Sequence, residues 1–193
     1  MNILTMCSAL NNSYLGIEFE DKQTTKIIKS DENYHSLYLI SEIKNLIQDF
    51  KKLDIVSVNC GMGSFTGIRV ALSIAKTLCC ELNIPLIPLN TTEILLKAYN
   101  KEVLIMDARR DMYYFGTKEG TQLVSKDKIF DCNNVLCDKR SLKLFKNALC
   151  FEEDEKDLAI TMLDLTKEKY SLKKDFNPLK VEANYIQTPP IFG

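Results

Sequence analysis

The chain has 193 residues, of which 46% are hydrophobic and 26% are charged. This length is enough for one large domain or two small lobes, and this composition is typical of a folded globular protein. The 25 lysines and arginines are balanced by 26 aspartates and glutamates. The resulting net charge of -1 excludes a large, uniformly positive surface for nucleic acid or membranes.

Cysteine content and hydropathy indicate the compartment. The seven cysteines follow no disulfide-framework spacing, which favours a reduced, cytoplasmic protein. The stretch from Ile3 to Leu10 is too short and too polar for a signal peptide, so we expect no export. The longest uncharged run, residues 55–68, contains three glycines and is shorter than the roughly 20 apolar residues of a membrane-spanning helix. We therefore expect no membrane partner.

The first hundred residues alternate between strand patterns and helix patterns. Short β-rich segments separated by turn residues predict a meander, and apolar residues at helical spacing predict the helices. The predicted elements, in chain order, are strands at residues 3–6, 14–19 and 24–28, a helix within 34–50, a strand at 54–60, a helix at 68–82, an extended segment at 84–89 and a helix capped by residues 90–93 and ending near 99. We expect this first lobe to comprise residues 1–100.

The remainder of the chain, residues 101–193, predicts a smaller second lobe that also begins with a strand hairpin. Strands at residues 102–106 and 112–117 flank a charged turn. Beyond this hairpin, the predicted elements are a strand at 123–130, helices at 141–149 and 158–170, and an extended tail at 178–193.

The most informative segment reads CGMGSFTGIR, from Cys60 to Arg69, between a predicted strand and a predicted helix. Its glycines permit a sharp turn, its hydroxyls can cap the helix, and amides at a helix start beside an arginine can hold an anion. The same residues can also serve only to shape and cap the helix, and both interpretations stay open. The residues concerned are Gly61, Gly63, Ser64, Thr66, Gly67 and Arg69. A P-loop is excluded because the lysine that its motif requires after the last glycine is absent.

This segment resembles the signature of the TsaB family, also called YeaZ, which is close to GPGSFTGLR followed by a helix of small residues. The resemblance extends over nearly the whole chain. Its further matches are His35-Ser36, Ile84-Pro85-Leu86, Asp107-Ala108-Arg109-Arg110 followed by Tyr113, and Pro178-Leu179-Lys180-Val181, which resembles the family's terminal strand.

The resemblance implies an α/β fold of two ribonuclease-H-like lobes, as in the actin-like ATPase superfamily, with a shortened second lobe. It also implies a non-catalytic subunit that activates TsaD, the metal-dependent subunit that transfers threonylcarbamoyl from its adenylate to adenosine 37 of tRNAs reading codons that begin with A. The ATPase TsaE joins this complex, and a homodimer is a further possible state. Under this hypothesis the chain has no cofactor of its own, ATP and a metal ion belong to the partner subunits, and tRNA is reached only through the complex.

The residues themselves argue against independent catalysis. With His35 as its single histidine, the chain cannot supply a paired-histidine metal site. Phosphate-handling members of this fold carry an aspartate at the end of the first strand, where this chain has Cys7, and a thiol does not replace a carboxylate for magnesium. The alternatives that stay open are a nucleotide-dependent or glycoprotease-like enzyme, built on Cys7 and His35 or on Ser64, His35 and Asp107, and a homodimeric binding module.

The helix predicted at residues 68–82 is apolar on most sides, so one face is expected to pack on the sheet and the other to contact a partner. Together with the preceding amphipathic helix it predicts an interface comprising His35, Leu39, Ile43, Ala71, Ala75 and Leu78. Arginine at Ala71 or Ala75 is then expected to weaken partner binding and leave the fold intact.

Two further groups of residues complete the predicted sites. The resemblance implies that Cys7, Ser8, Asp107 and Arg109 line a cleft between the lobes, where the last two orient the second lobe or meet TsaE. The basic pairs Lys139-Arg140 and Lys173-Lys174 are isolated, are typical of solvated surface, and are too few for an independent tRNA site.

Overall fold

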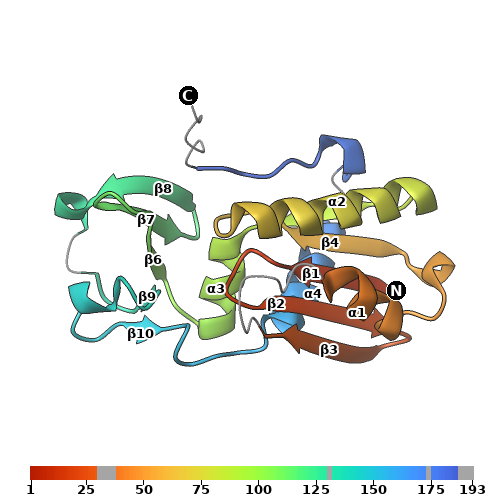
Figure 1. Ribbon diagram of the computed structural model, residues 1–193, viewed down its shortest axis with the longest axis horizontal. Coiled ribbons are helices and arrows are strands. Elements are labelled where there is room, and N and C mark those ends of the chain that lie inside the picture. Colours follow the sequence, from red (N-terminus) through yellow and green to blue (C-terminus); the bar gives the residue numbers. More distant parts are fainter. Residues whose placement is uncertain (30–37, 130–131, 173–174, 187–193) are drawn as a thin grey trace. The chain divides into compact units, whose positions relative to one another are not determined.

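The computed structural model describes residues 1–29, 38–129, 132–172 and 175–186, and it divides the chain into two compact units (Figure 1). Lobe 1 is Met1–Thr91 together with Asp157–Asn184, and lobe 2 consists mainly of Thr92–Lys156. The division therefore differs from the single boundary expected near residue 100. The difference arises because the helix at 158–171 packs on the first sheet, a long-range choice that local sequence patterns do not encode.

Lobe 1 contains a five-stranded mixed sheet with the strand order β3-β2-β1-β4-β5. The first three strands are antiparallel neighbours, and β4 and β5 run parallel to β1. The elements are β1 Ile3–Cys7, β2 Ser13–Phe19, β3 Lys22–Ile28, α1 Leu39–Leu46, β4 Ile55–Asn59, α2 Phe65–Leu82, β5 Leu86–Leu89 and α4 Leu158–Ser171.

The two faces of this sheet carry alternate residues of each strand. Leu4 and Val58 lie in the core beneath α1 and α2. On the opposite face, the Ser57 hydroxyl lies 2.7 Å from that of Thr5 and 2.6 Å from that of Thr166 on α4, and all three side chains are fully buried. Every residue of β1 and β4 is buried because helices cover both faces.

Lobe 2 repeats this arrangement with the order β10-β9-β6-β7-β8, in which β6 takes the place of β1. Strands β6, β7 and β8 are antiparallel neighbours, whereas β9 and β10 extend the sheet in parallel from β6. The elements are α3 Thr91–Tyr99, β6 Val103–Asp107, β7 Met112–Thr117, β8 Gly120–Ser125, β9 Val135–Cys137 and β10 Leu149–Cys150. The expected α/β fold class with two ribonuclease-H-like lobes is confirmed.

Several predicted elements differ from those observed. The helix expected within 34–50 is described only as α1, followed by a 3-10 turn at Phe50–Lys52, and residues 30–37 lie outside the described part of the chain. The helix expected at 141–149 is a 3-10 turn, Leu142–Leu144, followed by β10, because Leu142, Leu144 and Phe145 pack individually against the second sheet.

Two predicted strands also differ from the observed elements. The strand expected at 123–130 begins and ends earlier, as β8, and Lys126–Lys128 form a 3-10 turn. The segment resembling the family's terminal strand is also a 3-10 turn, Pro178–Lys180, because the Asn177 side chain accepts a hydrogen bond from the Leu179 amide and proline suits a first helical position.

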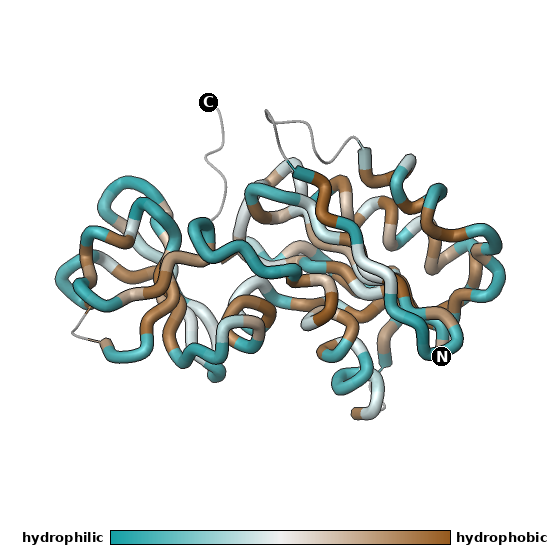
Figure 2. The backbone as a smooth tube through the Cα atoms, turned by 90° about the horizontal axis from the view of Figure 1, so that it is seen from below, coloured by the Kyte–Doolittle hydropathy of each residue, from teal (hydrophilic) through white to brown (hydrophobic). Residues whose placement is uncertain are grey.

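Hydropathy follows this architecture. Figure 2 shows that hydrophobic residues lie mainly in the strands and helices and that hydrophilic residues gather in the connecting turns. Among the residues that the structure describes, no helix combines the length and the hydrophobicity needed to cross a membrane.

Candidate functional site

The glycine loop joins β4 to α2 and lies beside the turn that follows β1. The Ser64 amide donates a hydrogen bond of 2.7 Å to the Ala9 carbonyl, and the Ser64 hydroxyl accepts one of 3.2 Å from the Gly67 amide. Ser64 is therefore the N-cap of α2, as its hydroxyl predicts. Thr66 is the second residue of the helix and is exposed.

The glycines of this loop permit a close approach of two backbones. A Cβ on Gly63 would lie under 3.0 Å from the Ala9 carbonyl oxygen, and one on Gly67 equally close to the Ser8 carbonyl oxygen. Gly63 also has a positive φ of 139°, and a Cβ on Gly61 would collide with the Thr91 amide. Carbonyl oxygens, the negative ends of their dipoles, thus occupy the space beside the helix start. This packing supports the structural interpretation of Gly61, Gly63 and Gly67 over anion binding.

The end of β1 is buried in a polar network around Asn59. The Asn59 side-chain amide donates to the Cys7 sulfur at 3.2 Å and to the Thr91 hydroxyl at 3.0 Å, and its oxygen accepts from the Gly61 amide at 2.9 Å. Burial raises the pKa of the Cys7 thiol, although the hydrogen bond from Asn59 acts in the opposite sense. A neutral, fully buried thiol is a poor nucleophile, so this environment argues against catalysis by Cys7.

The prediction of a partner interface is wrong for most of its residues, because they are buried. Leu39, Ile43, Ala71 and Ala75 are at most 2% exposed and belong to the core between the helices and the sheet. Small residues on α2 let it approach the sheet closely, so the alanine stripe faces inward. Leu78 is half-buried against the same core, and His35 lies outside the described residues.

Apart from Arg69 of the glycine-loop motif, the outward sides of α1 and α2 carry residues that the sequence patterns do not single out. Tyr38, just before α1, and Ile40 on α1 are 58% and 52% exposed. At the start of α2, Phe65 is 39% exposed and the Arg69 guanidinium lies 4.0 Å from its ring centroid. The signal that could have identified Ile40 is an isoleucine among the polar residues of an amphipathic helix.

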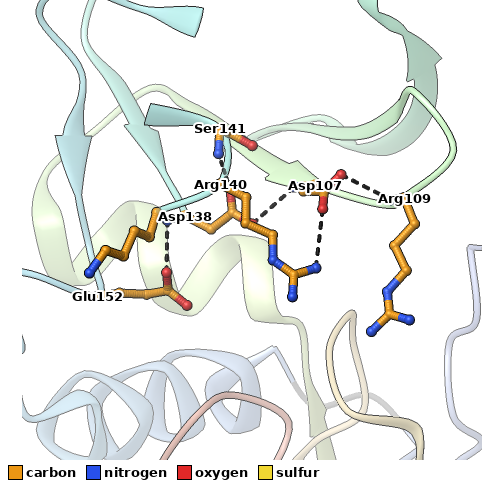
Figure 3. A network of polar contacts seen from close by, with 7 residues as sticks. Asp107, Arg109, Asp138, Arg140, Ser141 and Glu152 are labelled. Atoms are coloured by element: carbon orange, nitrogen blue, oxygen red, sulfur yellow. Dashed lines mark hydrogen bonds and ion pairs between the residues drawn. The ribbon is translucent and has the colours of Figure 1, made fainter. Parts of the chain in front are cut away.

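In lobe 2, Asp107 ends β6 and organises a charged loop (Figure 3). Its carboxylate accepts a hydrogen bond of 3.0 Å from the Arg109 amide and pairs with the Arg140 guanidinium at 3.3 Å. The Asp107 amide in turn donates to the Asp138 carboxylate at 3.1 Å, which also accepts from the Ser141 amide at 2.9 Å. Asp138 thus ties the β6–β7 loop to the loop that follows β9.

The predicted cleft residues fall into two separate groups. Cys7 and Ser8 are fully buried and form hydrogen bonds with Asn59 and Ser13 of lobe 1, so neither side chain lines an open cleft. Asp107 and Arg109 lie together in lobe 2, and their role between the lobes stays a prediction. In the part of the chain that the structure describes, no group of three or more metal-ligating side chains comes together.

The family model for TsaD, tRNA N6-adenosine threonylcarbamoyltransferase, matches residues 28–148. The chain is similar to the tRNA threonylcarbamoyladenosine biosynthesis protein TsaB of Buchnera aphidicola, with 28% identity over 123 residues covering 58% of this chain and 55% of the relative. It is similar to TsaB of Bacillus subtilis with 28% identity over 138 residues, which are 66% of this chain and 60% of the relative. These matches span less than two thirds of either relative.

The fold is similar to that of YeaZ from Pseudomonas aeruginosa, with a TM-score of 0.76 and 14% identity, covering 96% of this chain and all of that one. The family model covers more than half of this chain, and the matched region includes the glycine loop and the charged loop of lobe 2. The chain therefore belongs to the family that this model describes, and its similarities to TsaB proteins and to YeaZ identify it as a member of the TsaB/YeaZ family.

Proposed function

We propose that this chain is the non-catalytic subunit that binds and activates TsaD in the transfer of threonylcarbamoyl from threonylcarbamoyl-adenylate to adenosine 37 of tRNA. The observation that supports this proposal most strongly is the tight packing at the carboxyl end of β1, where a phosphate would otherwise bind. The family resemblance implies that Cys7 takes the position of the aspartate found in phosphate-handling proteins of this fold. Cys7 is fully buried, and backbone carbonyls pack against the glycine loop. ATP, a metal ion and the transfer chemistry then belong to TsaD and TsaE.

The outer surface of α1 and α2 is the proposed contact with TsaD. Both helices cover the same face of the sheet, so Tyr38, Ile40, Phe65 and Arg69 project from one side of lobe 1. Aromatic and arginine side chains are enriched among the residues that dominate the binding energy of protein interfaces. The core residues beneath them hold both helices on the sheet.

Co-elution with TsaD tests this surface directly. We expect Ile40→Arg to weaken TsaD binding about tenfold or more, because an unpaired charge enters a desolvated contact. A matched control is Ile160→Arg on α4, which covers the other face of the sheet; Ile160 is 46% exposed and Ile40 is 52% exposed. Equal affinities of the two variants would remove α1 from the interface.

The activating role is tested by threonylcarbamoyl transfer to tRNA by TsaD and TsaE, supplied with the adenylate, with and without this chain. We expect transfer to depend on the chain and to fall with Ile40→Arg. ATP or peptide hydrolysis by the purified chain, abolished by one named substitution, supports the enzyme alternative instead. A stable homodimer without affinity for TsaD supports the binding-module alternative.

A further inference from the structure

The loops of lobe 2 line an open, shallow cavity of about 600 Å³ that is rich in basic residues. Its lining residues are Asp107, Arg109, Arg110, Asp111, Tyr113, Lys139, Arg140 and Lys143. Five of these eight residues are cationic and two are anionic, in a chain whose net charge is -1. The fold therefore brings Lys139-Arg140 together with Arg109-Arg110, whereas Lys173-Lys174 lies outside the described residues.

The composition of this lining is unusual for this chain. Among its 25 basic residues only four are arginines, Arg69, Arg109, Arg110 and Arg140, and three of the four line the cavity. Arginine differs from lysine in presenting a planar fork of donors that matches the oxygens of a phosphate. A concentration of the scarcer cation in one place indicates recognition of phosphate rather than general solubility.

Two loops supply these cations, and the buried carboxylate of Asp138 connects them. The β6–β7 loop contributes Arg109 and Arg110, and the segment after β9 contributes Lys139, Arg140 and Lys143. Asp138, only 8% exposed, accepts hydrogen bonds from both segments, as described above. Figure 3 shows the guanidinium groups of Arg109 and Arg140 extending to the same side of the Asp107 carboxylate.

Most of this positive charge is not neutralised within the lobe. Among the described residues, Arg140 pairs with Asp107, whereas Arg109, Arg110, Lys139 and Lys143 have no carboxylate within 4.0 Å. All five cationic side chains are exposed. These neighbouring cations repel one another, so the approach of an anionic ligand lowers the electrostatic free energy.

We infer that this cavity binds the phosphodiester backbone of RNA, an inference that rests on the proposed function in tRNA modification. It replaces the expectation that tRNA is reached only through the complex, because five cations that are dispersed in the sequence line one cavity. The cations come from side chains on two loops rather than from a cradle of backbone amides, and they spread over an open surface. This arrangement suits successive phosphates of a strand, which are contacted mainly by arginine and lysine side chains. The cavity positions the RNA and reads no base sequence.

Binding of a fluorescent tRNA transcript to the full chain alone tests this inference. At about 50 mM salt we expect Lys139→Glu/Lys143→Glu to weaken binding about tenfold or more and to reduce the slope of log K against log salt by about 2. Lys51→Glu/Lys52→Glu is the matched control, because it reverses two adjacent exposed lysines of lobe 1 and changes the net charge equally. We expect the control to change the affinity less than about threefold.

The outcomes separate this inference from the proposed function. Absence of RNA binding by the unmodified chain, or equal losses in the two variants, overturns the inference without affecting the TsaD experiments. Displacement of the RNA by ATP or inorganic phosphate, at concentrations where sodium chloride of equal ionic strength has no effect, assigns the cavity to a small phosphate compound and also overturns it. Lys139→Arg/Lys143→Arg is expected to retain binding.

Discussion

The two lobes share one strand order but differ in what they place at the end of the first strand. β1 ends at Cys7 and β6 ends at Asp107, and each strand has an antiparallel neighbour on one side and a parallel one on the other. Cys7 is fully buried against Asn59, whereas the Asp107 carboxylate is 20% exposed and pairs with Arg140. The same position is therefore used for packing in lobe 1 and for charge in lobe 2.

The loops that follow these strands differ in the same way. In lobe 1 the carbonyls of Ser8 and Ala9 pack against glycines of the loop before α2. In lobe 2 the consecutive residues Arg109, Arg110 and Asp111 have φ values of 66°, 53° and 58°, a left-handed conformation that is costly for residues other than glycine. The comparison teaches that one topology can close one of its two equivalent ends and leave the other available for a ligand.

The largest expected effect comes from changing the residue at the end of the first strand of each lobe. We expect Cys7→Asp to lower the free energy of unfolding by about 3–5 kcal/mol, because the new charge is fully buried and no cation is present among the described contacts of Cys7. Asp107→Asn is the matched change in lobe 2. It keeps an acceptor for the Arg109 amide and is expected to cost about 1 kcal/mol or less. Urea unfolding of both variants measures the difference.

Similar losses for Cys7→Asp and Asp107→Asn would contradict the assignment of the two strand ends to different roles. Recovery of ATP hydrolysis in Cys7→Asp would also contradict it, since that result requires an accessible phosphate site in lobe 1.

Two glycines with positive φ provide the second test. Gly63 has a φ of 139° and Gly120 one of 147°, but a Cβ on Gly63 meets Ala9 whereas nothing lies within 4 Å of one on Gly120. We expect Gly63→Ala to lower the free energy of unfolding by about 3 kcal/mol or more, because two backbones must separate. Gly120→Ala is expected to cost about 1–2 kcal/mol, the backbone strain alone. Equal decreases in the free energy of unfolding would show that the close approach of Gly63 to Ala9 does not contribute to stability.

Local patterns predicted those parts of the fold whose signals are short-range. The helix expected at 158–170 is α4, Leu158–Ser171, because Asp157 caps an apolar repeat. The hairpin of residues 102–117 and the strand, glycine loop and helix of residues 54–82 are likewise observed. The segment at 141–149 was missed because its apolar residues contact a sheet built from distant strands.

The candidate sites were harder to predict, because exposure and convergence depend on tertiary packing. An alanine stripe such as Ala71 and Ala75 fits either a partner helix or the chain's own sheet, and only the arrangement of the sheet decides between them. The basic cavity unites Arg109 with Lys143, which are far apart in sequence, so neither pair of adjacent cations signals it alone.

Ion pairs give the third and smallest test of the contrast between the lobes. In lobe 1 the Glu18 carboxylate, 7% exposed, lies 2.8 Å from the Lys167 ammonium and accepts a hydrogen bond of 2.7 Å from Gln23. Burial acts to raise the pKa of Glu18, but these two hydrogen bonds and the charge of Lys167 outweigh it and hold the pKa below its ordinary value of 4.5. The same pair raises the pKa of Lys167 above 10.5.

A lowered carboxyl pKa stabilises the folded state above the unfolded pKa of 4.5, and that stability is lost as pH falls through the lower folded value. We therefore expect Glu18→Gln to lower the free energy of unfolding at pH 7 by about 1 kcal/mol, a value discounted because Lys167 is more than a third exposed, and to flatten the decline below pH 4.5. In lobe 2, Arg140→Gln breaks an exposed pair and is expected to cause no measurable change. Unfolding measured from pH 3 to pH 7 separates the two, since a pair that stabilises only through packing leaves the acid decline of Glu18→Gln parallel to that of the unmodified chain.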